Sequence, residues 1–160
     1  VTQIAILSSL TFSPIHSFQQ NTNTNTNLHQ TSQLHMSSLS TKTIDSHLHV
    51  WATSEQSKNY PYAPNQTPPP SLIDISSTSH LLQQMNHAGV DGALIVQPIN
   101  HMYDHRYVQD AIQKYPDKFK GMLLFDPSLP EAGDLAVNRL EELVMAGFVG
   151  VRFNPYLFTP

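Results

Sequence analysis

The chain has 160 residues, a formal net charge of -4 and a sequence pI near 6.1, which together argue against several classes of protein. An acidic chain offers no basic face to a phosphate backbone, so we expect no nucleic-acid partner. No apolar run approaches the roughly 18 residues that cross a membrane, so we expect no membrane partner. Because cysteine is absent, the chain can form neither disulfides nor thiolate metal sites.

Residues 1–42 differ in composition from the rest of the chain. Val1 to Thr41 contains no Asp, Glu, Lys or Arg, and the apolar run at residues 4–7 is too short for a core. Such a segment buries too little apolar surface to offset its ordering entropy, so we predict a disordered N-terminal segment. A Ser-rich, acid-poor N-terminus is also typical of a transit peptide. It predicts a chloroplast location, with the cytoplasm as the alternative.

From Lys42 onward, strand and helix signals alternate along the chain. We predict, in chain order, a strand at 44–50, a Pro-rich loop at 51–75, a helix at 79–88, a strand at 93–97, a helix at 104–115, a strand at 122–125, a helix at 135–145 and a strand at 148–153. Strands separated by helices favour a parallel sheet of the α/β class. No Gly-rich phosphate turn follows any strand, and polar residues end all four strands, which favours a barrel over a doubly wound sheet.

A complete (β/α)8 TIM barrel needs roughly 250 residues. We therefore predict that residues 43–160 are the N-terminal part of such a barrel, about its first half, and that the chain is a fragment. The predicted helices carry apolar faces at helical spacing. The residues expected to face the sheet are Leu81, Leu82, Met85 and Ala88, then Val108, Ala111, Ile112 and Tyr115, then Ala136, Leu140, Leu143 and Val144.

The first predicted strand reads Ile-Asp-Ser-His-Leu-His-Val over residues 44–50. Side chains on a strand alternate between its two faces, so Asp45, His47 and His49 are expected to share one face, opposite Leu48. Two imidazoles at i and i+2 can hold one divalent ion. The alternative is a pair of satisfied interior histidines. We predict a catalytic and metal site at His47 and His49, with a structural role for Asp45.

The run from Asp45 to His49 resembles the first-strand signature of the amidohydrolase superfamily. The runs 95–98 (Ile-Val-Gln-Pro) and 150–154 (Gly-Val-Arg-Phe-Asn) are similar to those of its amidohydrolase-2 branch, and within it to the lactonase and 2-pyrone-4,6-dicarboxylate hydrolase group. The resemblance covers residues 43–160, about half of such a barrel.

This resemblance implies a hydrolase of a small carbonyl substrate, a lactone or cyclic ester bearing a carboxylate. It implies one divalent metal ion, usually zinc, which polarises the carbonyl and lowers the pKa of a bound water. His47 and His49 match the first ligands of the family, whose further ligands and catalytic Asp follow on strands five, six and eight. Some lactonases of this branch work without metal, so a metal-independent mechanism stays open.

Three further polar residues are candidate substrate-binding groups. Arg152 offers a planar fork that suits a substrate carboxylate, and Asn154 is expected to share its face. The alternative for Arg152 is a structural ion pair. Gln97 either donates to a substrate carbonyl or is a purely structural amide.

The remaining polar residues near the strand ends are expected to be structural or solvated. Asp126 is expected to cap a helix or form a turn, and His101, Tyr103 and His105 to lie at the surface. The Pro-rich loop at 51–75 is expected to cover the pocket.

Three other readings remain open from the sequence. A phosphoesterase or nuclease of the same barrel type usually adds a middle-strand Glu for a second metal, but the later strands here offer Asp126 and Arg152 instead. A decarboxylase of the same branch would use a similar pocket. The third alternative is a truncated product that is inactive and self-associates, and the sequence does not fix the oligomeric state.

Overall fold

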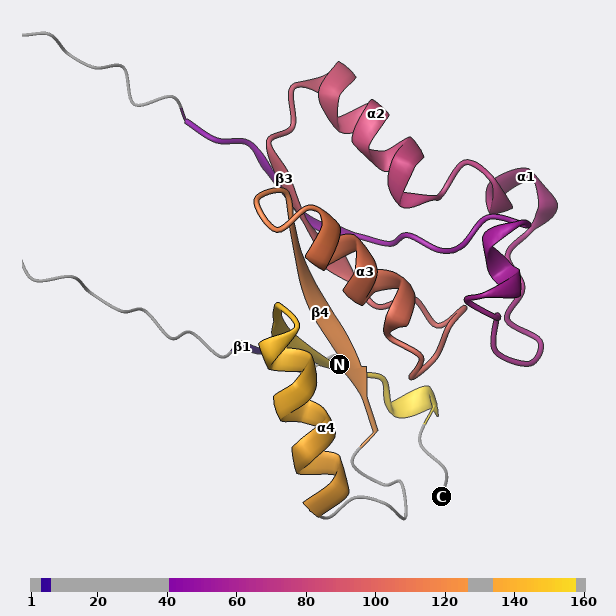
Figure 1. The fold of residues 1–160 in the computed structure, drawn as a ribbon, viewed down its shortest axis with the longest axis vertical. Coiled ribbons are helices and arrows are strands. Elements are labelled where there is room, and N and C mark those ends of the chain that lie inside the picture. Colours follow the sequence, from indigo (N-terminus) through magenta and orange to yellow (C-terminus); the bar gives the residue numbers. More distant parts are fainter. Residues whose placement is uncertain (1–3, 7–40, 127–133, 158–160) are drawn as a thin grey trace, which may run out of the picture. The chain divides into compact units, whose positions relative to one another are not determined.

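The fold is known from a computed structural model that describes residues 4–6, 41–126 and 134–157. Its centre is a sheet in the order β1-β5-β4-β3-β2 (Figure 1). The strands are β1 (Ile4–Ile6), β2 (Ile44–Leu48), β3 (Gly92–Val96), β4 (Phe119–Phe125) and β5 (Phe148–Phe153). Strands β2 to β5 pair in parallel with their neighbours along the chain, as the sequence predicts.

Helices connect the parallel strands, and the three longest pack on one side of the sheet (Figure 1). The helices are α1 (Pro70–Ile73), α2 (Thr78–Ala88), α3 (Arg106–Lys114) and α4 (Asp134–Met145), with short 3-10 turns η1 (Gln56–Lys58) and η2 (Pro155–Leu157). In the part of the chain that the structure describes, no helix is long and apolar enough to cross a membrane.

The predicted ends of α2 are confirmed by its caps. The Ser77 hydroxyl accepts a hydrogen bond from the His80 amide at 3.3 Å, which satisfies one of the free donors in the first turn. Gly89 ends the helix in the left-handed region at φ 68°, a conformation that glycine adopts without steric cost. The predicted range 79–88 therefore agrees with the observed helix to within one residue.

One short strand comes from the segment that the sequence predicts to be disordered. Ile4–Ile6 pairs antiparallel with β5, with Ile4 opposite Arg152 and Ile6 opposite Gly150. The outer edge of β5 offers backbone donors and acceptors that a short β-branched run can pair with. The prediction of disorder therefore does not hold for these three residues. Residues 1–3 and 7–40, which carry most of the transit-peptide prediction, lie outside the described residues.

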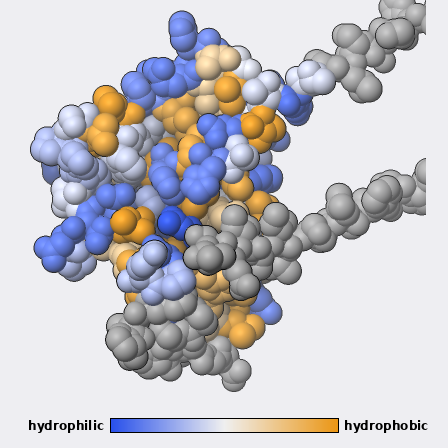
Figure 2. Space-filling view, turned by 180° about the vertical axis from the view of Figure 1, so that it is seen from behind, coloured by the Kyte–Doolittle hydropathy of each residue, from blue (hydrophilic) through white to orange (hydrophobic). Residues whose placement is uncertain are grey.

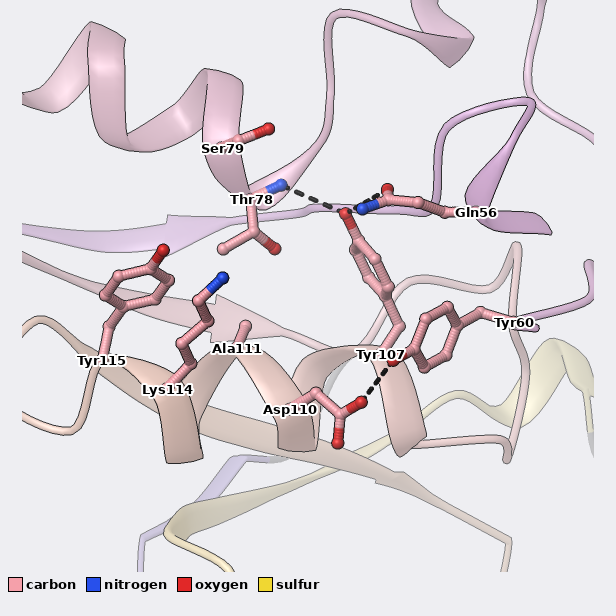
Figure 3. A pocket seen from close by; sticks show the side chains of 9 residues that line it. All are labelled: Gln56, Tyr60, Thr78, Ser79, Tyr107, Asp110, Ala111, Lys114 and Tyr115. Carbon is pink, nitrogen blue, oxygen red and sulfur yellow. Dashed lines mark hydrogen bonds between the residues drawn. The ribbon is translucent and has the colours of Figure 1, made fainter. Parts of the chain in front are cut away.

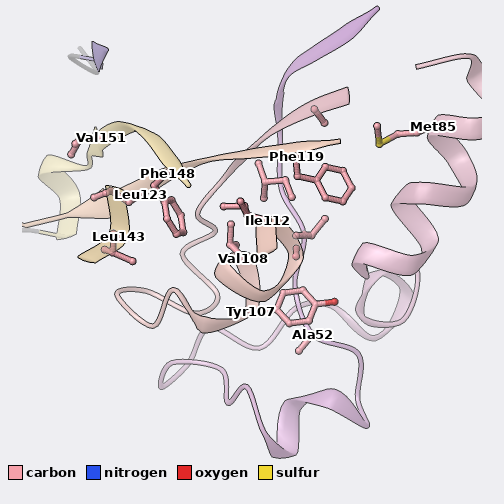
Figure 4. Packing of buried hydrophobic residues seen from close by; sticks show 14 residues of the cluster. Ala52, Met85, Tyr107, Val108, Ile112, Phe119, Leu123, Leu143, Phe148 and Val151 are labelled. Carbon is pink, nitrogen blue, oxygen red and sulfur yellow. The ribbon is translucent and has the colours of Figure 1, made fainter. Parts of the chain in front are cut away.

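The core lies between the helices and the covered face of the sheet (Figure 4). Val108 and Ile112 of α3 contribute to one buried cluster with Leu123 of β4, Phe148 of β5 and Leu143 of α4. Most of the predicted inward residues are buried or half-buried, as the cluster shows. Together these side chains remove a continuous apolar surface from water, which is the main stabilising contribution to such a layer.

Two predicted inward residues are wrong. Ala88 is exposed, and Val144 is 46% exposed while Leu143 is 2% exposed. Val144 lies about 100° around the helix axis from Leu143, and in α4 it falls at an uncovered edge of the apolar stripe. The periodic pattern defines an apolar stripe, but tertiary packing decides which edge of the stripe is covered.

The opposite face of the sheet carries apolar residues with no covering layer among the described residues. Ile44 is 56% exposed and Val149 is 41% exposed, and both line a hollow of about 320 Å³ with Leu94 and Lys120. The view from behind shows hydrophobic patches interspersed with hydrophilic ones (Figure 2). In a barrel, this layer of side chains meets the side chains of the facing strands.

Packing of the core can be tested at Gly121. A Cβ at this position would lie 2.6 Å from Ile112 Cδ1 and 2.6 Å from Phe148 Cδ1. We expect Gly121→Ala to lower the free energy of unfolding by about 1–3 kcal/mol through overpacking, measured by urea unfolding of the full-length protein. The control is Gln113→Ala, at an exposed position of α3, which should change stability by no more than about 0.5 kcal/mol. Equal effects of the two substitutions would contradict this packing.

Candidate active site

His47 and His49 lie together at the carboxyl end of β2. Their ring centroids are 5.2 Å apart and the rings meet edge to face at 87°. Both side chains are exposed rather than buried in the core. The structure therefore brings together the two imidazoles that the sequence predicts as a site, on a surface that a substrate or ion can reach.

A β-bulge alters the alternation of side chains along β2. Asp45 is in register with Ala93 and Leu48 with Ile95, and the register shifts between them. Since Ala93 and Ile95 both belong to the core side of β3, Asp45 and Leu48 lie on one side of the sheet. The prediction that Asp45 shares the face of the histidines is wrong, because strict alternation assumes a strand without a bulge.

Asp45 has a structural role in this bulge. Its Oδ1 accepts a hydrogen bond from the backbone amide of His47 at 3.0 Å. This contact satisfies a donor at the point where the ladder to β3 is interrupted. Asp45 therefore supports the backbone that carries His47.

The imidazole of His49 is held in one tautomer by the neighbouring strand. Its Nδ1 lies 2.8 Å from the carbonyl oxygen of Val96 in β3, so Nδ1–H donates and Nε2 keeps its lone pair. Desolvation lowers the pKa of His49, against the opposing effect of the Val96 hydrogen bond, and the charges of His47 and Arg152 lower it further. The ring is therefore neutral near pH 7 and presents an acceptor nitrogen.

Arg152 lies half-buried on β5, in register with Leu124 of β4. Among the described residues, no carboxylate forms an ion pair with its guanidinium. The structural ion pair left open by the sequence thus has no partner in this part of the chain. The influence of its charge on His49 indicates that the guanidinium acts on the same region as the histidine pair.

Asn154 follows β5 and caps the turn η2. Its Oδ1 accepts from the amide of Tyr156 at 3.3 Å, and its backbone carbonyl accepts from Leu157 at 3.0 Å. Its side chain is half-buried. The geometry gives Asn154 a turn-forming role beside the substrate-binding role expected for it.

Gln97 is fully buried at the end of β3. Its amide nitrogen donates to the carbonyl oxygens of Met102 at 3.0 Å and Asp104 at 2.9 Å. Both amide hydrogens are therefore used within the chain. The geometry favours the structural alternative, in which Gln97 holds the loop 98–104 in place.

The expectation of surface positions for His101 and His105 is wrong. Each is only 3% exposed. Nε2 of His101 accepts from the Ala52 amide at 3.2 Å, and Nε2 of His105 contacts the backbone of Leu124. A single histidine carries no periodic signal of its own. His105 nevertheless precedes Val108 and Ile112 by three and seven residues, the spacing of one helix face, and that pattern was the available clue.

Tyr103 and Asp126 contact each other. Tyr103 is more enclosed than the surface position expected for it, whereas Asp126 has the structural role expected for it. Tyr103 is half-buried, and its hydroxyl donates to the carboxylate of Asp126 at 3.3 Å. Asp126 itself is 2% exposed. This contact agrees with a structural role for Asp126 at the end of β4.

The histidine pair fits part of a metal site. Across the described ranges, no group of three or more His, Asp or Glu side chains is placed to hold a metal ion. His47 and His49 supply two imidazole nitrogens of the kind that zinc prefers, and the Val96 carbonyl orients one of them as an outer partner does in metal sites. Two ligands alone do not complete a tetrahedral site, so further ligands have to come from other segments of the protein.

Comparison with known proteins identifies the family. Residues 44–156, most of the chain, match the family profile described as amidohydrolase, and the chain belongs to this family. Enzymes of the family generally use a divalent metal ion. The strands, the connecting helices and the histidine pair that ends the first parallel strand are thus parts of an amidohydrolase.

Individual relatives agree in fold. A 2-pyrone-4,6-dicarboxylate hydrolase of Comamonas testosteroni is 29% identical over 111 residues, which are 69% of this chain and 32% of that protein. The crystal structure of a probable 2-pyrone-4,6-dicarboxylic acid hydrolase from Acinetobacter baumannii, with citric acid bound, matches with a TM-score of 0.54 and 22% identity over 69% of this chain and 37% of that one. An Agrobacterium tumefaciens protein, in its apo form, matches with a TM-score of 0.50 and 18% identity over 68% of this chain and 35% of that one.

These likenesses show that the sheet and its helices are the first half of a (β/α)8 barrel, as predicted. The chain spans about a third of the length of the relatives it matches. The carboxyl ends of the strands, where His49 and Arg152 lie, form the face on which barrels of this kind place their chemistry.

Burial of His105 predicts a pH-dependent stability. Burial, followed by the charge of Arg139, lowers the pKa of His105 to about 4 from 6.5. The unfolded chain therefore binds a proton at a higher pH than the folded chain does, so this contribution to stability is complete above the unfolded pKa and is lost as pH falls toward the folded pKa. Between about pH 7.5 and pH 5 we expect a loss on the order of 2 kcal/mol from this group.

The measurement is the urea midpoint of the full-length protein across this pH range, for wild type and His105→Gln. The variant has no titrating group at this position and should show a shallower slope. His87→Gln, at an exposed position on α2, controls for the loss of an imidazole and should keep the wild-type slope. Parallel slopes for wild type and His105→Gln would exclude His105 as the source.

Proposed function

We propose that the whole protein hydrolyses a small lactone that bears a carboxylate group. The observation that carries this proposal is the placement of a neutral, oriented His49 beside His47, with the charge of Arg152, which has no ion-pair partner among the described residues, lowering the pKa of His49. The Comamonas testosteroni relative, named for hydrolysis of a pyrone dicarboxylate, supports the choice of substrate class.

In this proposal each residue has a defined task. His47 and His49 hold a divalent ion, for which we propose zinc, through their imidazole nitrogens, and the lowered pKa of His49 favours its neutral ring. Such an ion, when bound, supplies a Lewis acid for the carbonyl and lowers the pKa of a water molecule. Arg152 holds a carboxylate of the substrate through its planar fork, and its positive charge opposes protonation of His49. The groups that transfer protons come from later strands of the barrel.

Metal content tests the role of the histidine pair. We expect the full-length protein to contain about one zinc or similar ion per chain, measured by elemental analysis after gel filtration. Replacing both His47 and His49 with Ala should remove the metal and the turnover together, because both imidazole ligands of the proposed ion are lost. His87→Ala is the matched control and should retain both. Full activity in metal-free protein would show that the histidines act on the substrate without a metal.

Substrate recognition is tested at Arg152. We expect Arg152→Lys to raise KM for 2-pyrone-4,6-dicarboxylate by about ten-fold or more, since a point charge replaces a bidentate grip. The effect on kcat should be smaller, because carboxylate binding is shared by the bound substrate and the transition state. Loss of lactone absorbance follows the reaction, and assay for carbon dioxide detects the decarboxylase alternative. Arg139→Lys on α4 is the control, and an unchanged KM in Arg152→Lys would assign Arg152 to structure.

A further inference from the structure

The loop that leaves β2 runs through η1 and returns to the loop that follows β3. The amide of Ala63 donates to the carbonyl of Asn100 at 2.8 Å. In the reverse direction, the Asn100 side chain donates to the carbonyl of Gln66 at 2.7 Å. The two loops at the carboxyl ends of neighbouring strands are thus bonded to each other, within the region where the candidate site lies.

His101 makes the central contact between these loops. Its Nε2 accepts from the amide of Ala52 at 3.2 Å, and its Nδ1 lies 3.1 Å from the carbonyl of Pro61. Its ring stacks on Tyr62 at 5.1 Å and on Tyr107 at 5.7 Å between centroids. Since one nitrogen accepts and the other donates, only the neutral Nδ1–H tautomer makes both bonds. One side chain therefore joins the two ends of the segment 52–61.

Burial makes these bonds costly to lose. Ala52 is fully buried and His101 is nearly so, and the Tyr62 hydroxyl donates to the Ala52 carbonyl. Without the imidazole, the buried Ala52 amide would lose its partner, which is costly, and the Pro61 carbonyl, on an exposed residue, would lose its donor. Burial also lowers the pKa of His101, against the opposing effects of the Pro61 bond and of Asp104, which favours the neutral ring that the two bonds need.

The outer side of the same loop is tied to α3. The Tyr60 hydroxyl donates to Asp110, and the Tyr107 hydroxyl lies 3.1 Å from Oε1 of Gln56 (Figure 3). Tyr107 thus contacts His101 with its ring and the loop with its hydroxyl. The loop is fixed on both sides, and among these side-chain contacts His101 binds the backbone nearest to the strand that carries the site.

Only two residues, Val50 and Trp51, lie between His49 and Ala52. Between them, Val50 is 1% exposed and the Trp51 amide donates to the Ser76 carbonyl at 3.0 Å. The backbone on the carboxyl side of His49 therefore has no free segment before the His101 contact. On the other side of the ring, the bond from Nδ1 to Val96 sets the orientation of the imidazole.

We propose that His101 is a positioning residue for the candidate active site. It fixes the loop that leaves β2 and, through Ala52, the course of the backbone from which the His49 imidazole reaches Val96. The positioning role in catalysis rests on the proposed function, whereas the positioning of the loop and of the His49 ring does not.

The test uses the full-length protein with three variants. His101→Phe keeps an aromatic ring between Tyr62 and Tyr107 but removes both nitrogens. His101→Gln keeps one donor and one acceptor and replaces His101→Phe should the latter fail to fold. His87→Phe makes the same chemical change at an exposed position of α2 and is the matched control.

Three readouts separate positioning from simple stability. Amide exchange of segment 52–62 measures loop order, nitrogen-15 NMR of metal-free protein reports the His49 tautomer, and steady-state kinetics give kcat and KM for the lactone. In His101→Phe we expect about ten-fold or greater loss of protection at Ala52, a mixed His49 tautomer, and a larger fall in kcat than rise in KM. His101→Gln should recover part of each effect.

Unchanged exchange at Ala52 in the His101 variants would overturn the proposal, and so would a loosened loop with an unchanged His49 tautomer. If wild-type protein has no lactone turnover, the proposed function fails. The exchange and NMR results still decide the positioning role, because neither needs a substrate.

Discussion

The packing of α3 between β4, β5 and α4 is the contact on which the rest of the described structure depends. Gly121 leaves room for Ile112 and Phe148 to meet over the sheet, and a side chain there would overlap both. The strands beneath this packing pair in parallel, so their carboxyl ends lie at one edge. His49 and Arg152 belong to strands far apart in the chain, and they come to the same edge for that reason.

Buried polar side chains then organise the loops at this edge. Gln97 binds two carbonyls of the loop 98–104, and His101 within that loop binds the backbone of the loop that leaves β2. Loop backbone lacks the regular partners of helices and strands, so its buried amides and carbonyls need side chains to satisfy them. These residues connect the end of β3 to the loop that leaves β2.

The exposed histidine pair and the buried histidines illustrate two uses of one residue type. Both nitrogens of His101 and Nε2 of His105 contact backbone groups inside the fold, where burial lowers the pKa of each ring. His49 donates one nitrogen to Val96 and keeps the other for chemistry. The described half-barrel thus contains a prepared portion of a site, and the face of the sheet that bears Ile44 and Val149 is left for the side chains of other strands to cover.

Local patterns in the sequence determined the order of strands and helices, the caps at Ser77 and Gly89, the parallel class and the pairing of His47 with His49, because each depends on residues close together in the chain. Tertiary structure alone decided the rest. The bulge that moves Asp45 off the histidine face depends on pairing with β3, and the short strand Ile4–Ile6 depends on the free edge of β5. The burial of His101 depends on Ala52 and Pro61, which lie about forty or more positions away, so no local pattern could reveal it.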